Sequence, residues 1–142
     1  MDHLNTIKDY LKDELVGLKS TGKNRYFIEI EPRAIRKAAG FMSEELGMRF
    51  IMATSVDEKE SLDLMYFFSD DDSDIIYIIK IVLDRKRPVV ESISGIVSGA
   101  IWSENEISDL MGISFEGLPP VVMRYSEGDK KKRTAPLRKD GM

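Results

Sequence analysis

The sequence predicts an α+β domain, in which an antiparallel or mixed sheet of about four strands carries helices mainly on one face, followed by an extended C-terminal tail. Some segments repeat apolar residues at intervals of three and four, as helices do, and others alternate apolar and polar residues, as strands do. Three strand-like runs follow one another with only short turns between them, which favours an antiparallel sheet with helices on one face. A change of composition after residue 117 separates a domain of residues 1–117 from a tail of residues 118–142.

The length and the residue types narrow the possible chemistry. A chain of 142 residues fits one domain and buries roughly two-thirds of the surface that its unfolded form exposes. Without cysteine the chain cannot supply a thiol nucleophile or hold an iron–sulfur cluster, and we expect no cofactor. The single histidine, His3, lies in an N-terminus that we expect to be frayed, and we interpret it as inert. The chain has neither a signal peptide pattern nor an apolar run of roughly 18 residues, which predicts a soluble cytoplasmic protein.

Charge is distributed unevenly along the chain. Residues 1–117 contain 14 Lys and Arg against 22 Asp and Glu, a balance of −8, whereas residues 118–142 contain 7 against 3, a balance of +4. The tail has few large apolar residues, so we expect it to become ordered only against a partner. Its basic run at residues 130–133 leaves a nucleic-acid-binding module as the alternative function, because neutralising phosphates supplies non-specific affinity.

The first third of the chain predicts a helix, a strand and a second helix. Apolar residues at helical spacing run from Leu4 to Leu18, and Gly22 can end that helix. Residues 25–30 alternate in character and predict a strand. The second helix is expected to begin at Pro32, because the first helical turn has no partner for the missing N–H, and to close at Gly47.

The middle of the chain predicts three consecutive strands. Residues 49–56 are apolar on both faces, which predicts an inner strand. Residues 62–68 and 75–83 are also strand-like, and the Asp- and Ser-rich stretch between them predicts a hairpin turn. The alternate aspartates of this stretch have the spacing that begins a calcium loop, but Ile75 and Ile81 occupy the positions that require glycine and a bidentate glutamate. We therefore interpret the stretch as an acidic hairpin tip.

Residues 102–117 predict a helix that stops at a glycine and is followed by a short extended segment. One broad apolar stripe along the helix is formed by Trp102, Ile107, Leu110 and Met111. Gly112 suits the left-handed position after a helix end. The helix also carries three acidic residues, Glu104, Glu106 and Asp109. Glu106 and Asp109 share a face, as the acid–base pair of a stand-alone enzyme would, but the sequence shows no pocket and no group that would shift the pKa of either.

The order of residues in this stretch resembles the signature of the C subunit of complex I, the NADH-quinone oxidoreductase, and of the related small subunit of membrane-bound, energy-converting nickel–iron hydrogenases. The positions in register are Trp102, Glu104, Glu106, Asp109, Gly112, Ile113, Phe115 and Gly117. The similarity extends from about residue 50 to the C-terminus and includes residues 51–57, 92–93 and 136–140. The chain departs from the family at Asn105, Leu118 and Pro120, where arginine, histidine and aspartate are usual, and these departures fit a hydrogenase-type member.

The resemblance implies a structural subunit of an oxidoreductase complex, without a redox centre or active site of its own. Family members grip the large catalytic subunit with the sheet domain and the tail. The implied partners are that large subunit and the small iron–sulfur subunit, at the periphery of a membrane-associated complex and without nucleic acid. The residues expected to form the signature and contact the partner are Trp102, Glu104, Glu106, Asp109, Gly112, Phe115, Arg124, Arg138, Lys139 and Asp140.

Each of these residues has an expected role. Trp102 and Phe115 anchor packing, the carboxylates pair with basic groups, Gly112 permits the turn, and the charges of the tail hold the partner. The sequence leaves the choice between the hydrogenase and the respiratory branch open.

Overall fold

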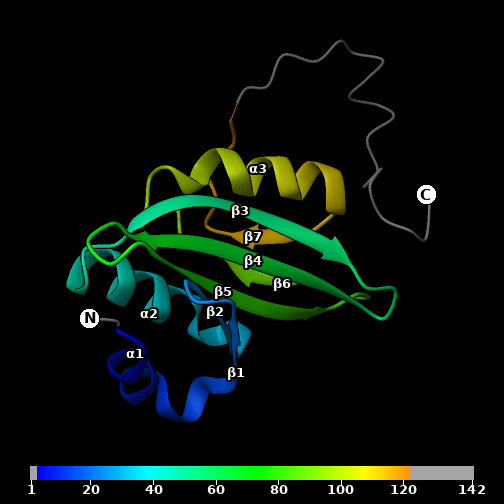
Figure 1. The fold of residues 1–142 in the computed structure, drawn as a ribbon. Helices are drawn as coiled ribbons and strands as arrows, with labels where there is room; N and C mark the ends of the chain where they lie inside the picture. The colour runs from blue at the N-terminus through cyan, green and yellow to red at the C-terminus, as the bar shows by residue number, and fades with distance from the viewer. Residues whose placement is uncertain (1–2, 122–142) are drawn as a thin grey trace.

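A mixed five-stranded sheet lies at the centre of the computed structural model, which describes residues 3–121 (Figure 1). Its strands, in the order in which they lie side by side, are β1 Leu15–Thr21, β2 Arg25–Ile30, β5 Ile75–Asp84, β4 Ser61–Asp70 and β3 Arg49–Asp57. β2 and β5 run parallel, and the other neighbours run antiparallel. A second, parallel pair joins β6 Val89–Glu91 to β7 Ser114–Glu116. The predicted α+β class is confirmed, with five strands in the main sheet instead of about four.

The additional strand, β1, occupies part of the predicted first helix. Helix α1 covers only Leu4–Leu11, a 3-10 turn follows at Lys12–Glu14, and the chain then pairs with β2. The prediction of one helix through Leu18 is therefore wrong. Val16 and Gly17 are weak helix formers, and pairing with β2 fixes the segment as a strand. Gly22, expected to end a helix, has a φ of 70° in the turn between β1 and β2.

The histidine near the N-terminus is held against the sheet. The backbone N–H of His3 donates to Tyr77 Oη at 2.8 Å, and His3 Nε2 lies 3.2 Å from Asp70 Oδ2. The expectation of a frayed terminus at this residue is therefore wrong, whereas its chemical inertness stays a prediction.

The second helical segment begins at Pro32 as predicted. A 3-10 turn at Pro32–Ala34 leads into α2, Ile35–Gly40, which continues as a π-helical turn at Phe41–Glu45. Gly47 follows with a φ of 67°, a conformation that glycine adopts without the steric cost of a side chain.

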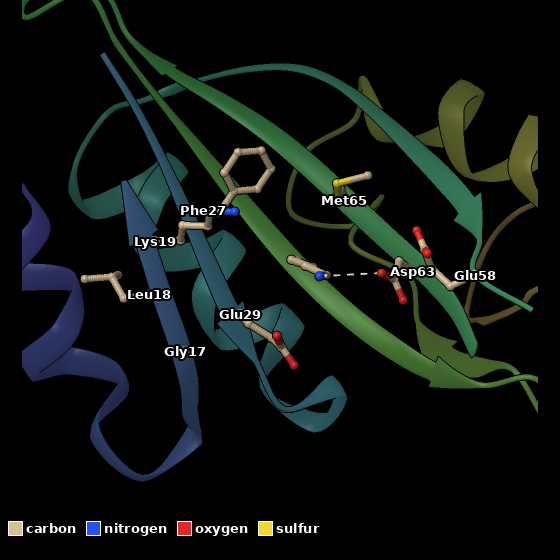
Figure 2. Close-up of a pocket in the computed structure, with 9 residues that line it drawn as sticks. Gly17, Leu18, Lys19, Phe27, Glu29, Glu58, Asp63 and Met65 are labelled. Carbon is tan, nitrogen blue, oxygen red and sulfur yellow. Dashed lines mark ion pairs between the residues drawn. The ribbon is translucent and has the colours of Figure 1, made fainter. Parts of the chain in front are cut away.

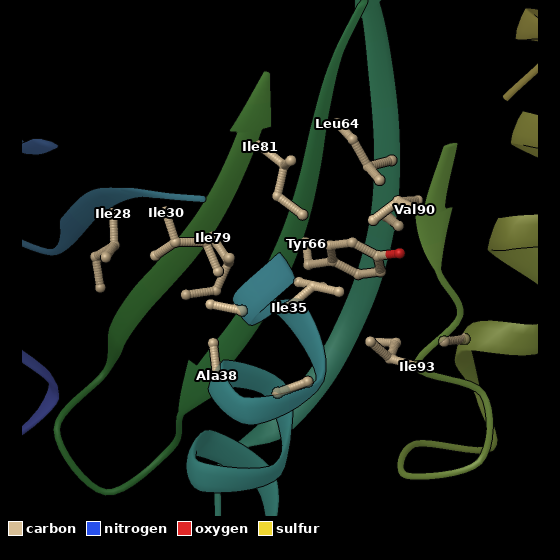
Figure 3. Close-up of a cluster of buried hydrophobic side chains, with 14 of the residues drawn as sticks. Ile28, Ile30, Ile35, Ala38, Leu64, Tyr66, Ile79, Ile81, Val90 and Ile93 are labelled. Atoms are coloured by element: carbon tan, nitrogen blue, oxygen red, sulfur yellow. The ribbon is translucent and has the colours of Figure 1, made fainter. Parts of the chain in front are cut away.

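The hydrophobic core lies on one face of the sheet, between the strands and the helices (Figure 3). Alternate residues of the strands point into it, because successive side chains of a strand face opposite ways; those fully buried include Ile28, Leu64, Tyr66, Ile79 and Ile81. All three α-helices contribute to the same cluster, with Ile7 and Leu11 from α1, Ile35 and Ala38 from α2, and Ala100, Ile107 and Met111 from α3, Ala100–Met111. The prediction of helices mainly on one face is confirmed.

β3 is an edge strand, so the prediction of an inner strand is wrong. Ile51 and Met52 on β3 are 40% and 45% exposed. Helix α3 packs alongside this edge (Figure 1), and the N–H of Ala53 donates to Ser103 Oγ at 3.4 Å. The helix thus covers an edge that would otherwise be open to another strand.

The acidic stretch between β4 and β5 forms the predicted hairpin turn. Asp70 accepts hydrogen bonds from Ser73 Oγ at 2.8 Å and from the N–H of Asp72 at 3.3 Å. Asp71 pairs with Arg49 Nε at 3.0 Å. Carboxylates of the turn therefore bind groups of the turn itself and of β3.

A largely buried ion pair joins the end of β3 to the turn that follows β5. Arg85 contacts the Asp57 carboxylate with both terminal nitrogens, and its Nη2 lies 2.7 Å from Asp57 Oδ2. The two side chains are 14% and 2% exposed. Asp57 also accepts a hydrogen bond from the N–H of Lys59 at 2.8 Å, which ties the β3–β4 turn to the same carboxylate.

Candidate functional site

Helix α3 is bound to the domain by one buried stripe. Its buried residues are Ala100, Glu104, Ile107 and Met111, which recur at intervals of four, three and four. At 3.6 residues per turn these positions fall on one side of the helix. The stripe is apolar except for Glu104, whose side chain is 0% exposed.

The carboxylate of Glu104 joins three separate parts of the domain. It accepts hydrogen bonds from Tyr66 Oη of β4 at 2.6 Å, from Ser92 Oγ at 2.5 Å and from the N–H of Ile93 at 3.0 Å. Ser92 and Ile93 lie in the connection between β6 and α3. Among the hydrogen bonds to this carboxylate within residues 3–121, all three come from neutral donors, so the prediction that Glu104 pairs with a basic group is wrong.

Burial and the neighbouring carboxylate affect the phenol of Tyr66. Burial, followed by the charge of Glu104 and the hydrogen bond to it, raises the pKa of Tyr66 well above its ordinary value. Tyr66 therefore keeps its proton and remains a donor to Glu104. Figure 3 shows the Tyr66 hydroxyl directed toward the segment that contains Ile93.

The connection held by Glu104 is also fixed from α2. Arg36 Nη1 donates to the carbonyl oxygen of Ser92 at 2.9 Å, and the Ser92 hydroxyl accepts from the N–H of Ser94 at 3.0 Å. Residues of α2, β4 and α3 thus converge on one short segment. This arrangement sets both the position of α3 and its rotation about its own axis.

The opposite face of α3 carries the remaining acidic residues and the tryptophan. Trp102 is 61% exposed, so its prediction as a packing anchor in the apolar stripe is wrong. Helical geometry places Trp102 about half a turn from the buried stripe, on the side where Glu106 and Asp109 also lie. We name these three residues the outer face of α3. Glu106 is exposed and Asp109 is half-buried.

The segment after α3 returns to the domain through the predicted glycine. Gly112 has a left-handed φ of 74°, and its N–H donates to Ser108 O at 3.0 Å, as expected of a residue that ends a helix. β7 then pairs with β6, which places Phe115 opposite Val90, and Phe115 is 8% exposed. The predicted roles of Gly112 in the turn and of Phe115 in packing are confirmed.

An amide on α3 fixes the point where the chain leaves the domain. Asn105 Nδ2 donates to Ile101 O at 2.8 Å and to Pro119 O at 3.0 Å. The start of the predicted tail therefore lies against α3. Four predicted contact residues, Arg124, Arg138, Lys139 and Asp140, lie outside residues 3–121, and their roles stay predictions.

The described part of the chain offers no obvious metal centre or membrane span. No three His, Cys, Asp or Glu residues within it are placed to hold a metal ion. None of the helices in residues 3–121 is both long and apolar enough to cross a lipid bilayer.

A comparison with protein families identifies the family to which the sequence belongs. The family described as the respiratory-chain NADH dehydrogenase, 30 Kd subunit, matches residues 28–141, which include α3, β7 and the tail. The chain belongs to this family. The resemblance drawn from the signature residues is therefore confirmed.

Two curated proteins are similar in sequence to this chain. The C subunit of the NADH-quinone oxidoreductase of Mesorhizobium japonicum is 27% identical over 146 residues, which cover 96% of this chain and 71% of that protein. The C subunit of the F(420)H(2) dehydrogenase of Methanosarcina mazei is 30% identical over 86 residues, which cover 58% of this chain and 52% of that protein. Both names denote subunits of redox enzymes, and neither mentions nucleic acid.

Two solved structures share the fold. A chain of the membrane-bound sulfane sulfur reductase, described as an archaeal respiratory membrane complex, has a TM-score of 0.83 at 21% identity and covers 98% of this chain and 83% of its own. A trypsin-resistant fragment of Nqo5 has a TM-score of 0.63 at 15% identity, covering 85% of this chain and 100% of the fragment.

Proposed function

We propose that this protein is a non-catalytic structural and assembly subunit of a membrane-associated redox complex of the complex I or hydrogenase type. In this proposal residues 1–117 form the docking domain and residues 118–142 the docking tail, and both bind the large catalytic subunit. The observation that carries the proposal is the arrangement of α3: Glu104 fastens the helix from inside, while Trp102 is 61% exposed on its outer face.

An exposed tryptophan on a rigid helix is suited to binding a protein. Tryptophan is enriched among the residues that contribute most to interfaces, because it buries a large area while losing few rotamers. The helix beneath Trp102 is already held by hydrogen bonds, so little further ordering is needed on binding. Ile51 and Met52, exposed on the strand that α3 packs against, add apolar surface on the same edge of the domain.

The tail supplies the second part of the proposed contact. It leaves the domain beside α3, at the Asn105–Pro119 hydrogen bond, and is basic in composition. A segment of this composition gains order by binding to a partner. Arg124, Arg138, Lys139 and Asp140 are the tail residues that we assign to the large subunit, and the small iron–sulfur subunit is the second proposed neighbour.

Co-purification tests the proposal. The tagged full-length chain should recover the large subunit, and Trp102→Ala should weaken that recovery by about 30-fold in affinity, the effect of losing a strong interface contact. Trp102→Phe keeps an aromatic ring at the same place and should retain most of the binding. Truncation after residue 121 should also reduce recovery. Equal recovery by all four proteins would contradict the proposed docking surface.

A further inference from the structure

The two edges of the main sheet differ in how they are covered. Helix α3 lies along β3, whereas β2 is the only element with which β1 makes extensive contact in the described part of the chain. Val16 and Leu18 of β1 are 57% and 40% exposed. An edge strand of this kind presents unpaired N–H and C=O groups on which another strand can pair.

A groove of about 300 Å³ opens beside β1 on the face of the sheet that carries no helix (Figure 2). The strand register places Gly17 of β1 next to Glu29 of β2, and Glu29 next to Lys80 of β5. Phe27 and Met65 supply the apolar part of the lining. Because Gly17 has no side chain, the path from the outer edge of β1 to the carboxylate of Glu29 is open.

The fold of the monomer does not itself require glycine at position 17. A Cβ atom built there would meet no other atom closer than the Cβ of Glu29 at 4.0 Å, and the φ of Gly17 is not positive. Glycine within a strand lowers its stability relative to alanine and often marks either a β-bulge or a place where another backbone approaches. The register of β1 against β2 shifts between Leu15 and Gly17, so a bulge lies beside this glycine, but its φ is not positive and the bulge does not itself demand glycine. What the missing side chain provides is access to the groove.

The charges at this edge are complementary to those of the same edge in a second copy of the chain. Glu29 and Lys19 form no ion pair within residues 3–121, whereas Lys80 pairs with Asp63 at 3.5 Å. Lys19 lies on the same face as Gly17, two residues further along β1. If a second β1 strand pairs antiparallel about a two-fold axis at Leu18, each Gly17 faces the Lys19 of the other copy.

We infer that β1 is a self-association edge, on which a second copy of this chain pairs antiparallel about Leu18. Lys19 of each copy then extends over Gly17 of the other and reaches Glu29, across two strand spacings of roughly 10 Å in all. A lysine on an edge strand usually opposes pairing with another edge. In this register, however, Lys19 meets the negative charge of Glu29 and not a second positive charge. The contact is small, so the dimer is weak and dependent on concentration.

The dimer edge and the outer face of α3 lie on opposite edges of the sheet. The inference therefore does not depend on the proposed function, and self-association leaves α3 free in both copies. The tail leaves the domain beside α3, which packs along the opposite edge of the sheet from β1. A second copy supplies both the strand and the basic residue at the required register.

Sedimentation equilibrium of the full-length chain at increasing concentration tests the inference. Lys19→Glu and Glu29→Lys should each weaken dimerisation about tenfold or more, because each creates two like-charge contacts. The double variant restores both pairs with their signs exchanged and should dimerise within about threefold of the natural chain. Glu45→Lys, an exposed charge reversal away from the edge, should have no effect.

Substitutions at Gly17 give an independent readout. Gly17→Ala should fold normally and retain dimerisation, whereas Gly17→Leu should fill the groove and abolish it. A chain that stays monomeric up to about 1 mM would overturn the inference. A dimer that is insensitive to the two charge reversals would overturn it as well, since another surface would then form the contact. If the backbone amides of β1 exchanged slowly at every protein concentration, the chain's own tail would be the segment that pairs with β1, and the inference would be overturned.

Discussion

Replacing Glu104 with glutamine tests whether the buried carboxylate fastens α3 to the sheet. Glu104 accepts hydrogen bonds from Tyr66 Oη, Ser92 Oγ and the N–H of Ile93, and its side chain is 0% exposed. Glutamine has nearly the same shape, but it is neutral and replaces one acceptor oxygen with an NH₂ donor. With the remaining oxygen at the Oε2 position, Tyr66 and Ile93 keep their acceptor. The NH₂ group then faces the Ser92 hydroxyl, which can rotate to accept.

The expected cost comes mainly from the loss of charge. A hydrogen bond to a charged group contributes about 1.5–3 kcal/mol, against about 0.5–1.5 kcal/mol for a neutral one. Three bonds that each lose about 1 kcal/mol give about 3 kcal/mol, and relief from burying a charge offsets part of this loss. We expect Glu104→Gln to lower the free energy of unfolding by about 1–3 kcal/mol. For a chain of this length, that corresponds to a fall in Tm of about 4–12 °C.

Thermal and urea denaturation followed by circular dichroism measure this change. Glu106→Gln is the matched control, because it removes the same charge from the exposed side of the same helix. The control should alter the free energy of unfolding by less than about 0.5 kcal/mol. If Glu104→Gln were as stable as the natural chain and the control, the hydrogen bonds to Glu104 would not hold the helix and the reasoning would fail.

Four further predictions follow from other contacts. Tyr66→Phe should remove a pH dependence of stability. Because the folded-state pKa of Tyr66 is raised, the contribution of its hydroxyl is complete below the ordinary tyrosine pKa of about 10 and is lost progressively as pH rises from there through the higher folded-state pKa, so the difference in Tm between the two proteins should narrow as pH rises past 10. Asp57→Ala should lower the free energy of unfolding by about 3–5 kcal/mol in urea denaturation, because it removes one partner of a largely buried ion pair. Gly112→Ala should cost about 1–2 kcal/mol by the same assay, since alanine is strained at a φ of 74°. Trp102→Ala should change the free energy of unfolding by less than about 0.5 kcal/mol, in contrast to the loss expected for a buried tryptophan.

Local patterns in the sequence predicted the structure correctly where a single chemical feature of a residue decides it. The proline at position 32 starts a helical segment, the aspartate-rich stretch forms a hairpin turn, and Gly112 ends α3. Each of these residues has a backbone or side-chain property that acts within a few positions along the chain. The signature was informative for the same reason, since its residues lie within one helix and the short segment after it.

The predictions were wrong where contacts between residues distant in the sequence decide the structure. Residues 15–21 have apolar spacing that fits either a helix or a strand, and only pairing with β2 selects the strand. Ile51 and Met52 suggested an inner strand because a central strand and an edge strand covered by a helix have similar composition. Neither outcome follows from local propensity, because the deciding partner lies elsewhere in the chain.

The error at Trp102 was avoidable from the sequence. At 100° per residue, Ala100, Ile107 and Met111 define a narrow stripe, and Trp102 falls almost opposite to it, whereas Glu104 falls within it. Hydrophobicity alone placed Trp102 in the core and Glu104 outside it. A carboxylate within an apolar stripe indicates a buried hydrogen-bonded group, since a buried charge without partners is strongly unfavourable.

This reversal of polarity suits α3 to the proposed docking role. Apolar packing along the inner stripe favours burial but tolerates rotation of the helix, because dispersion and hydrophobic contacts have little directionality. The three hydrogen bonds to Glu104 are directional and fix the rotation of the helix about its axis, so the direction of Trp102 on the opposite side is fixed with them. Glu104→Ala, which removes the acceptor of all three hydrogen bonds, should therefore weaken the proposed binding of the large subunit as well as stability, although Glu104 is fully buried. Glu106→Gln, on the outer face, should affect binding alone.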